Sequence, residues 1–406
     1  MSEDEVAVTG LGLVTAAGIG AAATWDGLLS GRSRAAPDPR LAGLPVGFSC
    51  RSDFDTGAAL GRRAAARLDR FSAMAVAAAR EAVADAGLDT TSWDPLRVAV
   101  VIGVSSACTE HYDREFAWIA AGRPERVSPM AIMRSIPNMA AGEVGLDLGA
   151  RGPNLAVSTA CASGASAVGV ARDLVRAGGC DIAVAGGSES LRARSTAVGF
   201  HQMRALSVRG HDPEGASRPF DTDRDGFVLG EGAGLLVLER PAHARARGAR
   251  PRALLRGYGA SCDAHHTVAP HPDGRGAADA LRVALADAGM APGDIDHVNA
   301  HGTATRINDL AEFRALARVF RDPPPVTAPK GVLGHSAGGA GGIEAACCVL
   351  TLQHQLIPPT ANLDNPDPAI PLDVVRKAPR RARLTTAVSN SFGFGGQNAV
   401  LVFSTS

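Results

Sequence analysis

Three short segments each place a reactive polar side chain between an expected strand and a run of small residues. STACASG surrounds Cys161, NAHGTATRIND surrounds His301, and KGVLGHSAGG carries Lys330 and His335. A thiolate can attack a thioester carbonyl, and neutral imidazoles can donate hydrogen bonds to the oxyanion that forms. These residue types therefore favour acyl-transfer chemistry through a covalent thioester.

Cys161 stands where the β-branched run 157–159 gives way to small residues that begin a helix. Unpaired N–H groups and the dipole at a helix start favour a thiolate, so the sequence predicts a lowered pKa for this thiol. The same N–H groups can stabilise an oxyanion. The alternative is a buried, inert thiol, which is the ordinary interpretation of the other six cysteines.

His301 follows an expected strand and precedes Gly302, so its side chain is expected to point out over the sheet edge. Taken alone, it could equally be a structural histidine. His335 begins a second small-residue helix, where the dipole disfavours an imidazolium ion. Two neutral histidines beside a thiolate could both donate a hydrogen bond to one oxyanion.

Lysine is almost absent from the chain, occurring only at Lys330 and Lys377 among 41 basic residues. Because arginine and lysine are not interchangeable at a tight site, Lys330 indicates a need for a compact ammonium group. Glu344 lies nine residues past His335 in an apolar helix, and a buried carboxylate needs a partner. Lys330 is the expected partner.

The elements that must position these residues alternate between strands and helices, which predicts α/β layers with helices covering the sheets. The expected strands span 5–12, 97–104, 181–187, 232–239, 296–302, 386–390 and 398–403. The expected helices span 62–88, 165–179, 276–290 and 342–355. The stretches 105–150 and 191–230 lack clear periodicity and are expected to be functional loops.

The two halves of the sequence show a weak internal similarity. ACASGASAVGVARDLVRAG and GHSAGGAGGIEAACCVLTL both open on a reactive side chain and continue as a small-residue helix. This pattern predicts two similar units, residues 1–250 with the cysteine and residues 251–406 with the two histidines.

The composition of the 406-residue chain excludes several classes of protein. The formal net charge is zero, so neither nucleic acid nor a membrane surface is an expected partner. The seven cysteines form no C-x-x-C pair, which argues against a disulfide framework or a zinc ribbon. No apolar run is long enough to span a bilayer, and the acidic start lacks a signal-peptide pattern, so a cytoplasmic location is expected.

Three further segments imitate ligand-binding motifs without completing them. GLGLVTAAGIG (10–20) has Thr15 where a dinucleotide fingerprint needs its third glycine. DTDRDGFVLGEG (221–232) places Gly232 where a calcium loop needs its bidentate glutamate. CDAHHTVAPH (262–271) lacks standard metal-ligand spacing, so no metal is expected.

Together these segments resemble the β-ketoacyl-acyl carrier protein synthases, the condensing enzymes of the thiolase fold. The resemblance covers the whole chain, from VAVTGLGLVTAAG (6–18) through STACASG, RPFDTDRDGFVLGEGAG (218–234), NAHGTATRIND and KGVLGHSAGG to NSFGFGGQNA. It implies duplicated α/β halves that form a five-layer α-β-α-β-α core.

The resemblance also implies a role for each matching residue. Cys161 would carry the acyl chain, while His301 and His335 would stabilise the enolate that malonyl decarboxylation leaves. Lys330 and Glu344 would orient the histidines. The oxyanion hole would use the backbone amides of Cys161 and Phe394, with Phe394 also acting as a gate. Thr303 and Thr305 would bind the phosphopantetheine arm, and no cofactor is implied.

The pattern is most similar to the elongating Cys-His-His branch of this family. Within it, the Ala- and Arg-rich composition favours type II polyketide biosynthesis over fatty-acid elongation. A non-catalytic partner subunit that sets chain length usually lacks the cysteine, so Cys161 argues against that alternative. A thiolase would need a second catalytic cysteine near the carboxyl end, where GFGGQNA stands instead.

The resemblance further implies an external acyl carrier protein and a dimer, either a homodimer or a heterodimer with a chain-length-factor-like ketosynthase. Carrier proteins are acidic, so Arg62, Arg63, Arg67 and Arg204 are candidate docking residues, although a solvated helix face is equally compatible with them. Met130, Ile132, Met133 and Phe200 are candidate residues of the acyl tunnel.

Overall fold

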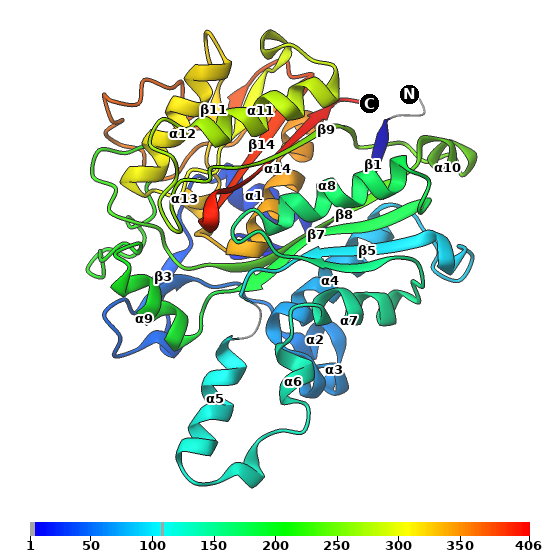
Figure 1. Ribbon diagram of the computed structural model, residues 1–406, viewed down its shortest axis with the longest axis vertical. Coiled ribbons are helices and arrows are strands. Elements are labelled where there is room, and N and C mark those ends of the chain that lie inside the picture. The colour runs from blue at the N-terminus through cyan, green and yellow to red at the C-terminus, as the bar shows by residue number, and fades with distance from the viewer. Residues whose placement is uncertain (1–4, 107–108) are drawn as a thin grey trace.

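The computed structural model describes residues 5–106 and 109–406 and contains one long mixed sheet. Helices cover both faces of the sheet and fill the space between its two folded halves, which gives the five layers seen from top to bottom in Figure 1. The path of the sheet reads β11(Val326–Thr327), β10(His297–Asn299), β14(Thr386–Gly393), β15(Gln397–Ser404), β9(Ala253–Cys262), β1(Val6–Thr15), β8(Glu231–Glu239), β7(Ile182–Ser190), β5(Val98–Gly103), β6(Asn154–Val157).

The strand order repeats about the middle of this sheet. From β1 outward, two antiparallel pairings lead to β8 and β7, and two parallel pairings lead to β5 and β6. From β9 outward, β15, β14, β10 and β11 follow with the same sequence of antiparallel and parallel pairings. The halves join where β1 pairs antiparallel with β9. We therefore propose that the boundary between the two units lies between β8 and β9, as the sequence predicts.

Two helices form the middle layer and meet at their small residues. These are α8(Ser163–Arg176), which follows Cys161, and α14(Ala340–His354), which follows His335. A Cβ atom on Gly164 would lie 2.6 Å from the backbone nitrogen of Gly342, and one on Gly341 would lie 2.3 Å from that of Ala165. The small residues thus allow backbone-to-backbone contact, which brings the starts of the two helices together.

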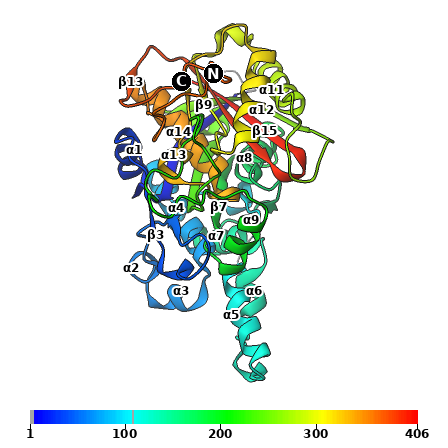
Figure 2. The same ribbon diagram turned by 90° about the vertical axis from the view of Figure 1, so that its left-hand side faces the viewer.

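The outer layers use amphipathic helices whose apolar faces cover the sheet. On one side α4(Arg70–Asp85) and α7(Met139–Leu148) cover the amino-terminal half. On the other, α11(Arg275–Ala288) and α12(Arg306–Val319) cover the carboxyl-terminal half. Figure 2 shows the same layers from the side. Among the residues described, no helix has both the length and the apolar character needed to cross a membrane.

The structure corrects several expected elements. The helix expected over 62–88 is two helices, α3(Arg62–Arg67) and α4, and Asp69 caps the second by accepting a hydrogen bond from the backbone N–H of Phe71. The stretches expected to be loops contain α5(Thr109–Ala120), α6(Ala131–Ser135), α7 and α9(Arg194–Gln202). Strand β9 is present in the structure, although none of the strands expected from the sequence covers its residues.

Replacing Gly164 with alanine should destabilise the protein, because its Cβ would also lie 2.8 Å from the carbonyl oxygen of Gly338. We expect a loss of about 2–3 kcal/mol in the free energy of unfolding, measured by urea denaturation. Gly199 in α9 is the matched control, since nothing lies within 4 Å of its Cβ position. Gly199→Ala should be neutral or stabilising by about 0.5–1 kcal/mol. Equal effects of the two substitutions would contradict close packing of α8 on α14.

Candidate active site

Cys161 lies in a strained turn between β6 and α8. Ala160 has a positive φ of 50°, a conformation that favours glycine over residues with a side chain. The Ser163 hydroxyl stabilises this turn, because it donates a hydrogen bond to the Ala160 carbonyl at 2.6 Å and accepts one from the Thr159 N–H at 2.9 Å. The turn fixes the direction of the cysteine side chain.

The thiol pKa prediction is wrong in direction. Burial raises the pKa of Cys161 to about 11, although the charge of Lys330 and the backbone N–H of Phe394 lower it. The helix begins only at Ser163, so Cys161 lies outside the first helical turn. The partial removal of the half-buried Cys161 side chain from water disfavours the anion. The resting side chain is therefore a neutral thiol.

His301 follows β10 and is held by charged groups on both sides. The Glu312 carboxylate accepts the backbone N–H groups of His301 and Gly302, each at 2.8 Å. The Lys330 ammonium donates to the His301 carbonyl at 2.6 Å and lies 3.3 Å from its Nδ1. Because an ammonium group only donates, Nδ1 must accept, and the ring proton is assigned to Nε2.

His335 is held by the backbone of a neighbouring segment. Its N–H donates to the Val228 carbonyl at 2.8 Å, and its carbonyl accepts from the Gly230 N–H at 2.9 Å. Its Nδ1 accepts the Ala337 N–H at 3.3 Å, which again assigns the ring proton to Nε2. The His301 and His335 rings lie edge to face with centroids 5.5 Å apart.

Both imidazoles are neutral at physiological pH. Burial holds the pKa of each well below its usual range, and the positive charge of Lys330 lowers both further. The predicted neutral state of His335 is thus correct, although burial is its largest cause. A neutral ring with its proton on Nε2 can donate one hydrogen bond to a developing oxyanion.

Lys330 and Glu344 form the expected buried pair, with Nζ and Oε1 2.5 Å apart and both side chains 2% exposed. Burial raises the pKa of Glu344 to about 7, while the charge and hydrogen bond of Lys330 oppose the rise. Lys330 begins α13(Lys330–Leu333), and Glu344 lies in the first turns of α14.

Phe394 lies in a glycine-rich turn that packs on the cysteine. A Cβ on the neighbouring Gly393 would lie 2.5 Å from the Thr159 carbonyl oxygen, so the turn touches the backbone just before Cys161. Gly395 and Gly396 have φ values of 80° and 74°. The Phe394 ring lies 6.2 Å from Phe200, centroid to centroid.

The structure adds four residues that the sequence analysis did not identify. Phe227 lies edge to face with both Phe200 and His335 at 5.3 Å, and Phe392 lies 5.7 Å from His301. Glu312 holds the His301 backbone, and Asn390 donates to Glu312 at 3.2 Å. Asn390 and Phe392 could have been identified from the NSFGFGG motif that contains them. Glu312 lies in the helix α12, whose sequence has no motif that marks a functional residue.

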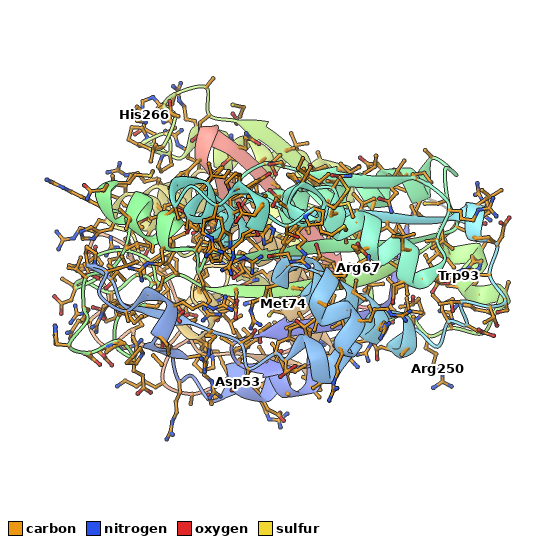
Figure 3. The ribbon with its side chains drawn as sticks, turned by 90° about the horizontal axis from the view of Figure 1, so that it is seen from below. Asp53, Arg67, Met74, Trp93, Arg250 and His266 are labelled. Atoms are coloured by element: carbon orange, nitrogen blue, oxygen red, sulfur yellow. The ribbon has the colours of Figure 1, made fainter. Side chains whose placement is uncertain are left out.

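The other candidate residues lie in different places. Thr303 and Thr305 follow His301, with their hydroxyl oxygens 3.0 Å apart, and Thr305 also caps α12. Arg62, Arg63 and Arg67 lie exposed on α3, and Arg67 also pairs with Glu143. Figure 3 labels Arg67. Arg204 is exposed beyond the end of α9.

The candidate tunnel residues separate into two groups. Phe200 packs beside Phe394 at the site. Met130, Ile132 and Met133 are instead 37%, 63% and 41% exposed, on or beside α6. Both Figure 1 and Figure 2 show α5 and α6 projecting from the body of the molecule. The predicted tunnel role of these three residues is therefore not met within a single chain.

No group of three or more His, Cys, Asp or Glu side chains within the described part of the chain has metal-binding geometry. The calcium-like segment is a turn, since Asp221 accepts hydrogen bonds from Arg218 and from the backbone N–H groups of Asp223, Asp364 and Asn365. The Glu344 Oε2 and Asn299 Oδ1 atoms are buried without a hydrogen-bond partner among these residues, and the Asn299 amide nitrogen donates to the Glu344 carbonyl at 3.1 Å.

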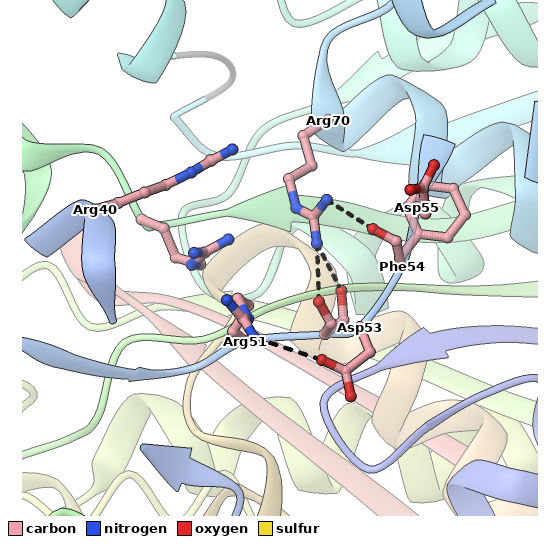
Figure 4. Close-up of a pocket in the computed structure, with 8 residues that line it drawn as sticks. Arg40, Arg51, Asp53, Phe54, Asp55 and Arg70 are labelled. Carbon is pink, nitrogen blue, oxygen red and sulfur yellow. Dashed lines mark hydrogen bonds and ion pairs between the residues drawn. The ribbon is translucent and has the colours of Figure 1, made fainter. Parts of the chain in front are cut away.

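A surface cavity of about 310 Å³ contains none of the candidate catalytic residues (Figure 4). Arg70 crosses it and donates to the carbonyls of Phe54 and Ser52, each at 3.0 Å. Arg70 and Arg192 also pair with the buried carboxylate of Glu231. This cavity is the solvent-facing side of a structural ion-pair network.

Comparison with known proteins identifies the class. Residues 3–244 match the family described as "Beta-ketoacyl synthase, N-terminal domain", and residues 252–364 match "Beta-ketoacyl synthase, C-terminal domain". The chain belongs to the beta-ketoacyl synthase family and is an acyltransferase-type ketosynthase with the thiolase fold.

Two curated relatives carry the name 3-oxoacyl-[acyl-carrier-protein] synthase 2. The protein from Synechocystis is 41% identical and covers 99% of this chain and 98% of its own length. The protein from Vibrio cholerae is 38% identical and covers 99% of both.

Solved structures place the chain near polyketide enzymes as well. "The ishigamide ketosynthase/chain length factor" has a TM-score of 0.92 at 37% identity and covers 99% of both chains. A type II polyketide synthase complex, AntDE:AntF, described as an acyl-carrier protein with its ketosynthase, has a TM-score of 0.91 at 29% identity over 99% of both chains.

Removing the ammonium of Lys330 should leave Glu344 as an unpaired buried group. We expect Lys330→Met to cost about 3–5 kcal/mol in the free energy of unfolding, measured by chemical denaturation. The double variant Lys330→Met/Glu344→Gln should recover more than half of that loss, because it no longer buries an unpaired carboxylate. A double variant no more stable than the single one would contradict the coupling.

Proposed function

We propose that this ketosynthase catalyses the decarboxylative condensation of an enzyme-bound acyl chain with malonyl-acyl carrier protein. One observation carries the proposal: two buried, neutral imidazoles, each with its proton on Nε2, lie beside the cluster in which Cys161 packs. Phe227 belongs to that cluster and contacts the His335 ring, and the charge of Lys330, which holds His301, also acts on the Cys161 sulfur. This arrangement offers a nucleophile for the acyl chain and two donors for a second carbonyl oxygen.

The first step is transfer of the acyl chain to Cys161. The sulfur attacks the thioester carbonyl of the acyl carrier protein, and the carrier thiol leaves with the proton of the Cys161 thiol. The backbone N–H groups of Cys161 and Phe394 stabilise the tetrahedral oxyanion. The contact between the Phe394 N–H and the sulfur supports this placement of the oxyanion hole.

The second step forms the carbon–carbon bond. His301 and His335 donate from Nε2 to the thioester carbonyl of the malonyl group, and the enolate forms as carbon dioxide leaves. The resulting carbanion attacks the acyl thioester on Cys161. Collapse of the tetrahedral intermediate releases the β-ketoacyl chain, and the Cys161 sulfur recovers a proton from solvent.

Lys330 and Glu344 act on this step through His301. The Lys330 ammonium fixes the imidazole tautomer, and Glu344 offsets the buried charge of Lys330. Thr303 and Thr305 are proposed to hydrogen-bond the phosphopantetheine arm, since their hydroxyl groups directly follow His301. No cofactor beyond the phosphopantetheine of the carrier is proposed.

The pathway we favour is type II polyketide biosynthesis, with fatty-acid elongation as the second candidate. The similarity to the ishigamide and AntDE:AntF structures supports the first, and the names of the two curated relatives support the second. The intact Cys161, His301 and His335 argue against a non-catalytic subunit that only sets chain length.

The partners proposed are an acyl carrier protein and a second ketosynthase-type subunit. Strand β6 is an edge strand whose first three residues are exposed, and α5 and α6 expose Phe116, Ile119 and Ile132. An unpaired edge and an apolar projection are typical of a subunit interface. We propose that this face joins a second copy or a chain-length-factor-like subunit.

Substitutions should separate the two chemical steps. Cys161→Ser should lower chain extension on the order of a thousandfold or more, because the acyl-enzyme no longer forms. His301→Ala and His335→Ala should each cost about 10²–10³-fold in extension while Cys161 still becomes acylated. Mass spectrometry of the Cys161 peptide and of the carrier-bound product measures both steps. Normal extension by Cys161→Ser would overturn the proposed function.

The acyl substrate distinguishes the pathways. We expect carrier-bound chains that retain a β-keto group or a double bond to be extended with malonyl-carrier, as read by product mass. Extension of saturated chains alone would favour fatty-acid elongation instead.

Carrier docking should depend on α3. We expect Arg63→Glu to raise KM for carrier-bound acyl substrate about tenfold with little change in kcat, since charge complementarity mainly affects association. A small acyl thioester without carrier should react as before. The surface variant Arg250→Glu is the matched control, because Arg250 is also exposed but lies in the segment before β9 rather than on α3. An unchanged KM in Arg63→Glu would reject this docking surface.

A further inference from the structure

The short helix α3, which carries three of the candidate docking arginines, has no core of its own. None of its six residues is buried, and an isolated helix of this length is marginal in water. The flanking Leu60 and Leu68 pack against the core. The orientation of the exposed helix between them therefore depends on polar contacts with other segments.

Two arginine contacts tie α3 to the segment that contains α6 and α7. Arg67 pairs with Glu143 of α7, whose side chain is 6% exposed. Arg134 of α6 donates from Nε to the Arg67 carbonyl at 3.0 Å and from Nη2 to the Ala66 carbonyl. Its planar fork can reach two carbonyls at once, and its charge complements the dipole at the carboxyl end of a helix. Arg134 thus caps the last turn of α3, which lies next to α6 in Figure 1.

The two ties differ in what anchors them. The helix α7 packs on the core through its buried residues. The helix α6 has five residues, and its Ile132 and Met133 are 63% and 41% exposed directly before Arg134. Large apolar side chains that are exposed together are typical of a surface that a partner covers. The partner subunit of the proposed function would bury them, and it would thereby fix the turn of helix from which Arg134 reaches α3.

We propose that Arg134 is a positioning residue that links the subunit interface at α6 to the carrier-docking helix α3. A partner that covers the apolar side chains of α6 orders this helix, so that Arg134 caps α3 and the exposed arginines of α3 face the acidic carrier. Without the partner, α6 is less ordered, the cap weakens and the carrier binds less tightly. The inference rests on the proposed function and adds that the assembled protein is the form that accepts the carrier.

The variant Arg134→Met removes the cap and keeps most of the length of the side chain. We expect the dissociation constant of a fluorescently labelled acyl carrier protein bearing phosphopantetheine, read by anisotropy, to rise about fivefold or more, because two charge-assisted hydrogen bonds to α3 are lost. Amide hydrogen exchange in a peptide covering residues 61–69 should become faster. The kcat for a small acyl thioester without carrier should not change, whereas a general loss of structure would lower it.

Arg282→Met is the matched control. Arg282 also donates to a carbonyl in the last turn of a helix, that of Arg318 in α12, but it lies in the other half of the chain. Its loss should leave carrier affinity unchanged. Arg134→Lys should give an affinity between those of the wild type and Arg134→Met, since lysine keeps the charge but lacks the planar fork.

The link to assembly is tested with Ile132→Glu, which places a charge on the apolar face of α6. Sedimentation velocity should show loss of the assembled form, and carrier affinity should fall about as much as in Arg134→Met. If Arg134 carries the link, the double variant Arg134→Met/Ile132→Glu should bind the carrier no more weakly than either single variant. Additive effects would mean that the partner acts on carrier binding by another route, and they would overturn the link.

Failure of this inference and failure of the proposed function give different results. Wild-type carrier affinity and wild-type exchange rates in Arg134→Met overturn the inference, while the docking surface stands if Arg63→Glu weakens carrier binding. Unchanged carrier binding in Arg63→Glu overturns the docking surface of the proposed function. An Ile132→Glu protein that still assembles overturns the proposed interface and the link with it.

Discussion

Lys330 and Glu344 bury an ammonium and a carboxylate group in the middle layer of the protein, and the geometry of the site follows from that pair. Two charges removed from water are tolerated only when each is paired and hydrogen-bonded. The Lys330 ammonium meets this requirement through Glu344 and through the carbonyl and Nδ1 of His301. The pair therefore fixes the His301 ring, which must donate from Nε2. The positive charge of Lys330 helps to keep that ring neutral.

Close approach of two backbones is the second requirement. The nucleophile precedes α8 and His335 precedes α14, so they share one site only if these helices touch. Glycines at 164 and 341 remove the side chains that would separate the two helices. Gly338 and Gly342 allow the start of α14 to pack equally closely on Ser105 and on the backbone of β7 and β8. The small-residue runs are thus the physical link between the duplicated fold and the chemistry, because each half contributes reactive groups at the start of its central helix.

The sequence predicts this arrangement well where a local pattern carries it. Cys161 and His301 each follow an expected strand, and His335 begins an expected small-residue helix, so local patterns identify all three. The rarity of lysine singles out Lys330, and its partner Glu344 is a carboxylate in an apolar helix. Strand β9 was missed because Gly257 and Gly259 interrupt its alternation, and both are required since a Cβ there would lie 2.3 Å and 2.1 Å from carbonyl oxygens of α11. Helix α5 was missed because its sequence TEHYDREFAWIA is largely polar.

The burial of Cys161 and the hydrogen bonds of the buried carboxylates cannot be predicted from the sequence, because both depend on which distant segments meet in the fold. The expectation of a lowered pKa for Cys161 rests only on the helix start, whereas burial of the side chain raises the pKa. Glu312 and Glu189 accept hydrogen bonds from backbone N–H groups 11 and 84 residues away along the chain. Such contacts leave no spacing pattern, since the donors are backbone groups that every residue except proline possesses.

The mechanism depends on the protonation state of the two imidazoles, which ring ¹⁵N NMR of histidine-labelled protein measures. We expect His301 and His335 to remain neutral from about pH 5 to pH 8 with the proton on Nε2, showing no titration over that range. A ring that titrates near its ordinary pKa, or that carries its proton on Nδ1, would be incompatible with donation from two neutral rings.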